Sequence, residues 1–183
     1  MRKRVAGLYI TLDGVTEAPE TWNPPYQTDE MQEAVLSQLA DADAMLLGRR
    51  SYQLFHHVFT GASAANIPHA GWMNDTPKFV VSTTLKEMEW QNSTLISSNV
   101  VEEITKLKQQ PGRNINVGAS ATLVRWLLGH GLLDELYLHV HPIVIGGGKR
   151  LFEDTSDRAP LRLLESRASS TGVVALRYGP DRG

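Results

Sequence analysis

Residues 113–130 join a short alternating segment to an apolar segment with helical spacing, and a glycine separates the two. Ile115 and Val117 alternate with asparagines before Gly118, as in a short strand that ends in a tight turn. The residues after the turn place apolar side chains on one face of a helix. A strand, a glycine and a helix in this order restrict the chain to folds in which strands and helices alternate.

The turn itself consists of small residues, namely Gly118, Ala119, Ser120, Ala121 and Thr122. The first turn of a helix has unpaired backbone N–H groups and a partial positive charge, so small side chains there allow an anion to approach. One interpretation is therefore a phosphate-binding turn. The other is a turn in which small residues serve only close packing.

Two more predicted strands end in groups that bind anions. An apolar run at residues 44–47 meets a glycine and then the start of a helical pattern, in the order Gly48, Arg49, Arg50 and Ser51. Guanidinium and hydroxyl groups hold phosphate oxygens through charge-assisted hydrogen bonds, and the glycine favours this interpretation over two solvated arginines. The strand predicted at 78–81 ends in three hydroxyl residues, Ser82, Thr83 and Thr84.

The remaining pattern alternates strands with helices and then ends in strands. We predict further strands at 5–12, 90–97, 136–140, 161–165 and 173–178, helices at 29–40, 52–58 and 100–108, and a loop over 60–77. This order predicts one domain over 1–183, a three-layer α/β/α fold with a mostly parallel central sheet and a C-terminal antiparallel hairpin. Ligands of such sheets bind outside the carboxyl ends of the strands.

The composition narrows the class of partner. A formal net charge of −2 argues against a nucleic-acid surface, which needs clustered Lys and Arg. The absence of cysteine excludes disulfides and Cys-ligated metals. No apolar run is long enough to span a bilayer and no signal-peptide core is recognisable, so we expect a soluble cytoplasmic protein without membrane partners.

Residues 13–28 form a long predicted loop after the first strand, and it contains Asp13, Trp22 and Tyr26. The two aromatic rings either bind a flat ligand or pin the loop to the core. Asp13 either orients a substrate and assists its protonation, or forms an Asx-type turn with Gly14.

Three chemical motifs are only partly matched. Ser120 has the place of the nucleophile in G-x-S-x-G, but Thr122 replaces the last glycine, so a serine hydrolase is a weak alternative. The sequence around Lys149 departs from the P-loop at two positions. His139 and His141 share one face of a predicted strand, but a third ligand is not evident, and we predict no metal site.

Taken together, several segments resemble the dihydrofolate-reductase-like family, of the riboflavin-biosynthesis reductase (RibD C-terminal domain) type. They are residues 11–14, 47–52, 78–85, 90–92, 118–122, 132–136 and 142–152, and they follow one another in the family's order over nearly the whole chain. The resemblance implies that Gly48 to Ser51 and Gly118 to Thr122 hold the phosphates of NADPH. It places Ser82 to Thr84 at the adenosine 2′-phosphate. Because Thr83 stands where relatives often carry Arg, NADH is not excluded.

The resemblance further implies a reductase that transfers a hydride from NADPH to a C=N or C=O carbon. The substrate would be pterin-like or aminopyrimidine-like, as for dihydrofolate reductase or 5-amino-6-(5-phosphoribosylamino)uracil reductase, and would lie beside Asp13, Trp22 and Tyr26. Glu30 and Glu33 are nearby candidate proton donors, and relatives commonly form homodimers. The alternative is a non-catalytic protein that binds a nucleotide or small ligand on the same fold.

Overall fold

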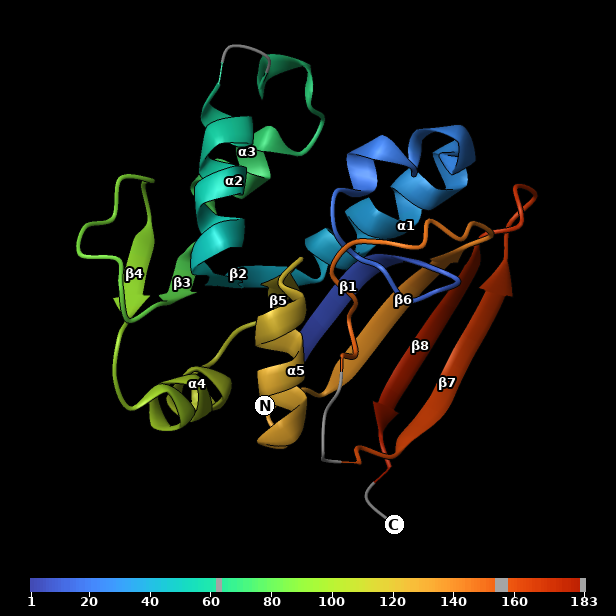
Figure 1. Ribbon diagram of the computed structural model, residues 1–183. Coiled ribbons are helices and arrows are strands. Elements are labelled where there is room, and N and C mark those ends of the chain that lie inside the picture. The colour runs from blue at the N-terminus through green and yellow to red at the C-terminus, as the bar shows by residue number, and fades with distance from the viewer. Residues whose placement is uncertain (62–63, 154–157, 182–183) are drawn as a thin grey trace.

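The computed structural model describes residues 1–61, 64–153 and 158–181 (Figure 1). Its centre is one eight-stranded sheet with the order β4-β3-β2-β5-β1-β6-β8-β7. The strands are β1 (Arg4–Thr11), β2 (Ala42–Gly48), β3 (Lys78–Val81), β4 (Ser93–Ile96), β5 (Asn114–Gly118), β6 (Glu135–His141), β7 (Leu161–Ala168) and β8 (Val174–Pro180). The first six pair in parallel, whereas β8 is antiparallel to β6 and β7. The predicted parallel sheet with a C-terminal hairpin is confirmed.

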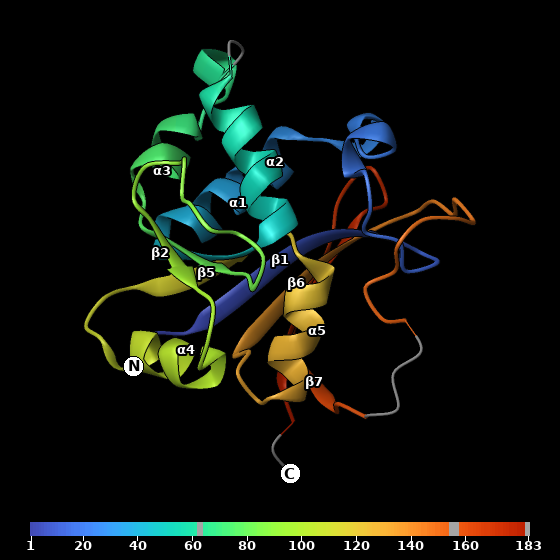
Figure 2. The same cartoon turned by 60° about the vertical axis from the view of Figure 1, so that its left-hand side comes forward.

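Helices cover both faces of the sheet (Figures 1 and 2). They are α1 (Asp29–Ala40), α2 (Arg49–Thr60), α3 (Ala70–Asp75), α4 (Val100–Gln109) and α5 (Ala121–Gly129), with 3₁₀ turns at Pro19–Thr21, Pro24–Tyr26 and Ala64–Asn66. None of the helices in the described ranges is long and apolar enough to cross a membrane.

Strand β2 shows why the fold has three layers. Its residues Ala44 and Leu46 belong to the apolar cluster under α4 and α5, whereas Met45 and Leu47 belong to a second cluster with α2 and α3. Side chains of a strand alternate between the two faces, so a strand with apolar residues at successive positions must be covered on both sides. The sequence of β2 therefore specifies helices above and below it.

The loop predicted over 60–77 is wrong, because the structure places α3 there. This segment is rich in Gly, Ala, Pro and Asn, a composition typical of loops, yet it contains a helix of six residues. Tertiary contacts stabilise it: Met73 is buried in the cluster with α2, and the side chain of Asn74 donates to the carbonyl of Phe59 and accepts from Trp90 Nε1. A helix this short depends on packing rather than on propensity.

Candidate functional site

The three strand ends singled out in the sequence lie side by side. Strands β3, β2 and β5 are neighbours and run in parallel, so the turns that follow them emerge at one edge of the sheet. After β2 the chain continues towards β3 and β4, and after β5 it crosses to β6 on the other side. The order of the strands therefore reverses at β2 and β5, where open α/β sheets bind ligands.

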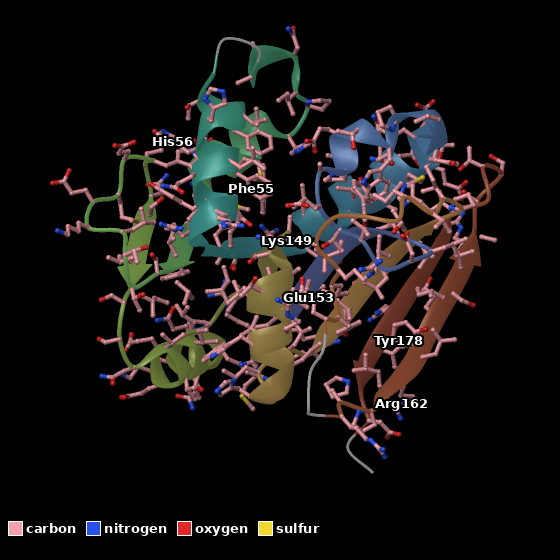
Figure 3. The ribbon with its side chains drawn as sticks, viewed as in Figure 1. Phe55, His56, Lys149, Glu153, Arg162 and Tyr178 are labelled. Carbon is pink, nitrogen blue, oxygen red and sulfur yellow. The ribbon has the colours of Figure 1, made fainter. Side chains whose placement is uncertain are left out.

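Gly48 and Ser120 bring two helix N-termini into contact. Gly48 is the N-cap of α2 and Ser120 the N-cap of α5, and a Cβ atom on Gly48 would lie 2.9 Å from Ser120 Oγ. A Cβ on Gly118 would lie 2.5 Å from a Leu47 methyl carbon and 3.1 Å from Phe55, which Figure 3 labels on α2. Both glycines are thus needed for the close approach, and the positive ends of two helix dipoles converge.

The two helix N-termini differ in their caps. Ser120 Oγ accepts a hydrogen bond from the backbone N–H of Leu123, whereas Gly48 has no side chain to cap α2. Ala119, just before Ser120, is exposed and has a positive φ of 26°, which is unusual for a residue other than glycine. The first N–H groups of α2 consequently lack a side-chain acceptor and can bind an anion.

Positive charge lies at the same place. Arg49 and Arg50 are exposed at the start of α2, and neither guanidinium has a hydrogen-bond acceptor or carboxylate partner among residues 1–61, 64–153 and 158–181. Ser51 is buried on the same turn. Ala121 is half-buried and Thr122 exposed at the start of α5. The edge therefore presents two free cations beside two helix N-termini.

The third strand end forms a compact turn. Ser82 is buried, and its Oγ accepts from the backbone N–H groups of Thr84 (3.2 Å) and Leu85 (3.1 Å). Thr83 and the side chain of Thr84 are exposed. Ser82 thus shapes the turn, and the two threonines are the residues placed to meet a ligand.

Asp13 joins two loops. Its carboxylate accepts from Thr11 Oγ1 at 2.6 Å and from the backbone N–H of Gly146 at 2.8 Å, and these hydrogen bonds hold the pKa of Asp13 below its usual value. The backbone oxygen of Asp13 accepts from Arg150 Nε. None of these contacts is an Asx-type turn with Gly14, because the backbone N–H of Val15 donates to Thr11 Oγ1 and the Asp13 carboxylate instead ties the end of β1 to the loop after β6. The catalytic role of Asp13 stays a prediction.

Trp22 and Tyr26 pack on His141. The ring of Trp22 is buried, its Nε1 donates to the carbonyl of Glu17, and its centroid lies 5.1 Å from that of His141. Tyr26 is half-buried, with its ring 5.6 Å from the same imidazole. The contacts of Trp22 agree with the pinning interpretation of this loop, while Tyr26 retains an exposed portion.

Sequence reasoning considered His141 only as a metal ligand and missed both its contact with this loop and its partner Asn23. His141 is fully buried, and its Nε2 lies 2.8 Å from Oδ1 of the buried Asn23. Its neighbour on the same strand face, His139, is buried against Tyr9, and burial lowers the pKa of His139 to about 4. In the sequence, the alternation of histidines along β6 is the one pattern that marks the contact between His141 and Asn23. Asn23 itself lies in a loop and belongs to no strand or helix periodicity.

The remaining candidates lack the contacts that their chemistry needs. Ser120 has no His or carboxylate partner among the described residues, so these residues contain no serine-hydrolase triad. The described ranges also hold no group of three or more metal-ligating side chains. Glu30 forms an ion pair with Arg167, and Glu33 is exposed. Among the described residues, neither carboxylate forms a hydrogen bond with a residue of the sheet edge.

Comparisons with known proteins agree with this geometry. The model of the RibD C-terminal domain matches residues 4–175. The uncharacterized protein YyaP of Bacillus subtilis (strain 168) is 31% identical over 179 residues, which cover 97% of this chain and 94% of that protein.

Solved structures share the fold at lower identity. A putative riboflavin biosynthesis protein from Shewanella sp. PV-4 has a TM-score of 0.81 and 18% identity, over 98% of this chain and 99% of that one. A dihydrofolate reductase from Enterococcus faecalis, complexed with NADP(H), has a TM-score of 0.63 and 12% identity, over 98% and 96%. The family model matches nearly the whole length of the chain, and the sheet has the strand-order switch described above. The chain belongs to the RibD C-terminal domain family.

Proposed function

We propose that the chain is an NADPH-dependent reductase of a pterin-like or aminopyrimidine-like small molecule. One observation carries the proposal: the N-termini of α2 and α5 converge at the strand-order switch, beside Arg49 and Arg50, which have no partner in the part of the chain that the structure describes. A dinucleotide has two linked phosphates, and two adjoining helix N-termini with two cations match that charge. The family match and the fold shared with an NADP(H)-bound reductase support the same conclusion.

The residues at the edge fit the groups of the cofactor. The N-terminal N–H groups of α2 and α5 would bind the pyrophosphate, with the guanidiniums of Arg49 and Arg50 against its oxygens. Thr83 and Thr84 would lie at the adenosine end, where their exposed hydroxyls meet a ribose or its 2′-phosphate. When bound, the cofactor supplies a hydride. NADH remains a second candidate cofactor, since this turn has no cation.

On the substrate side, the protein would position a planar ring near the 13–28 loop. The carboxylate of Asp13, whose pKa is held below its usual value by its hydrogen bonds, can accept a further hydrogen bond from a ring N–H or amino group. Tyr26 offers a partly exposed aromatic surface. The buried ring of Trp22 packs on His141 and holds the loop in place. Positioning is the contribution that these residues would make to the reaction.

A titration with NADPH and NADH, followed by energy transfer from tryptophan to the nicotinamide, tests the proposal. We expect saturable binding of NADPH, with NADH as the comparison, and oxidation of the cofactor when a dihydropterin or aminopyrimidine substrate is added. Absence of binding for both cofactors at millimolar concentration would disprove the reductase. Binding without any turnover would favour the alternative, a non-catalytic nucleotide-binding protein.

We further propose that the protein is a cytoplasmic homodimer. Strand β7 has one unpaired edge, and Leu163 and Leu164 on it are 50% and 41% exposed. An exposed apolar edge strand favours pairing with another strand, and a second copy of β7 supplies one of equal length. Light scattering coupled to gel filtration should give twice the mass of one chain, and Leu163→Arg should return it to a monomer.

A further inference from the structure

A second candidate site lies at the opposite end of the sheet, beneath the C-terminal part of α1. There the structure holds a cavity of about 240 Å³. It is lined by Lys3, Val5, Gln38, Asp41, Ala42, Asn114, Asn116, Glu135, Tyr137 and Arg177. Val5 and Thr11 lie at the two ends of this face of β1, and the six residue-to-residue steps between them separate the cavity from the cofactor edge by about 20 Å.

The face of the sheet under α1 is polar where a packed layer would be apolar. On β5, Ile115 and Val117 point into the apolar cluster of α4 and α5, and the alternate Asn114 and Asn116 point to α1. Helix α1 covers this face loosely, since Met31 is its one buried residue and Leu36 is 39% exposed. Within the described ranges this part of α1 therefore leaves room for a ligand between the helix and the sheet.

Three amide side chains in the cavity have no protein partner among the described residues. Asn116 is 8% exposed, yet its side-chain amide has no hydrogen-bond partner in the described part of the chain. The same holds within the described ranges for the side chains of Gln38 and Asn114. Gln38 and Asn114 are half-buried, and Arg4 Nη1 is the one fully buried side-chain nitrogen or oxygen without a partner among the described residues, so the three amides are accessible from the cavity. Their donors and acceptors are therefore free to bind a molecule there.

Charge excludes an anionic ligand. Lys3 and Arg177 both bind the carboxylate of Glu135, with Lys3 Nζ at 2.7 Å and Arg177 Nε at 3.0 Å. Together with Asp41 the lining holds two positive and two negative charges, so its net charge is zero. A phosphate or carboxylate would have to displace Glu135 from both of its partners.

The aromatic residues of the lining also disfavour a nucleobase as the ligand. Tyr137 is the one aromatic residue among the described lining residues, and the guanidinium of Arg177 lies over its ring at 5.4 Å. A nucleobase would therefore find no free ring to stack on. A hydroxyl group both donates and accepts, and so matches amides and carboxylates on all sides of the cavity.

From the cavity, the unpaired amides and the balanced charge, we propose that this site binds a small neutral polyol of the pentose or hexose class. The volume corresponds to about eight water molecules at roughly 30 Å³ each, which a sugar of this size would displace. The inference does not depend on the reductase, because the cavity and the cofactor edge share no residue.

The test follows the side-chain amide resonances of ¹⁵N-labelled protein by NMR during titration with D-ribose and D-glucose. We expect saturable shifts of Asn114, Asn116 and Gln38, with no shift of the exposed Gln32 on the outer part of α1. Asn116→Leu and Gln38→Leu should each weaken sugar binding at least tenfold, and Gln32→Leu should leave it unchanged. The two cavity variants come from different walls, so a folding defect in one leaves the other informative.

Three results would overturn the proposal. They are no saturable shift with either sugar, shifts that persist in both cavity variants, and equal shifts on addition of uracil or inorganic phosphate. Titration of Asn116→Leu with NADPH gives a separate readout. Unchanged cofactor binding together with lost sugar binding would establish the two sites as independent.

Discussion

The Nε2 atom of His141 lies 2.8 Å from Oδ1 of Asn23, and this buried contact joins the end of β6 to the loop of residues 13–28. Trp22 and Tyr26 surround the same imidazole edge-on. This buried polar contact, within an aromatic cluster, is one of several that hold the loop to the rest of the fold. Its position depends on a side chain 118 residues away in the sequence.

Replacing Asn23 with Leu should destabilise the protein and loosen this loop. The substitution leaves one buried imidazole nitrogen without a partner, which costs about 1–3 kcal/mol in the free energy of unfolding. Urea denaturation measures the loss, and limited proteolysis should cut residues 13–28 faster. Gln27→Leu, at an exposed position of the same loop, is the control and should change neither quantity. Equal behaviour of the two variants would refute the anchoring role.

Gly48→Ala should be destabilising because its Cβ would lie 2.9 Å from Ser120 Oγ. Overpacking of this kind costs about 1–3 kcal/mol, and Ser120→Ala alone should cost about 1 kcal/mol through the lost N-cap. In the double variant the oxygen that crowds the new Cβ is absent. The loss in the free energy of unfolding should therefore be smaller than the sum of the losses in the two single variants. Thermal and chemical denaturation of the four proteins complete the cycle.

The control for that cycle is Gly129→Ala in the last turn of α5. No atom lies within 4 Å of a Cβ built there, and the residue is helical with an ordinary φ. Alanine should therefore be neutral or stabilise by up to about 1 kcal/mol. Strict additivity of Gly48→Ala and Ser120→Ala would show that the two N-caps are not coupled.

Arg49→Ala and Arg50→Ala should each raise the Kd for NADPH about tenfold without lowering the melting temperature. Neither guanidinium has a partner among the described residues, so its removal should hardly change the free energy of unfolding. The same removal takes a charge-assisted hydrogen bond from the anion site and weakens NADPH binding. The difference in Kd between each variant and the original protein should become smaller as the salt concentration rises. Arg162→Ala, exposed on β7 (Figure 3), is the matched control and should bind NADPH normally.

Lys78 should give stability an unusual dependence on alkaline pH. Its side chain is fully buried, Nζ donates to the carbonyls of Asn74 and Thr76, and burial lowers its pKa to about 8. Between pH 8 and the unfolded value of 10.5, the unfolded chain holds a proton that the folded chain has released. The contribution of Lys78 to the free energy of unfolding therefore rises with pH across this range.

Comparison with Lys78→Met isolates that effect. The stability of the original protein relative to the variant should grow by at most about 3 kcal/mol from pH 7 to pH 10.5, at about 1.4 kcal/mol per pKa unit. Urea unfolding at several pH values measures it. Because Tyr9 and Tyr137 titrate in both proteins, their contribution cancels in the difference. A difference that stays constant with pH would contradict the lowered pKa of Lys78.

Local patterns in the sequence were enough for much of the fold. The helix predicted at 29–40 matches the bounds of α1, and Thr28 Oγ1 caps it by accepting from the backbone N–H of Met31. The strand over residues 78–81 was predicted with its observed bounds, whereas the strand predicted at 90–97 is shorter, Ser93–Ile96. Trp90, expected in that strand, instead packs in the cluster of α2 and α3. Helix α3 was missed because its stability comes from contacts distant in the sequence.

The sequence by itself determined the three strand ends and the residue types at them, because strand and helix periodicity, glycine turns and unpaired helix N–H groups are local properties. Only the tertiary structure decided that Gly48 meets Ser120, that Asp13 and Asn23 tie loops together, and that Asn116 faces a polar cavity. These relationships depend on strand order and register, which bring together residues tens of positions apart and leave no periodic signal in the chain.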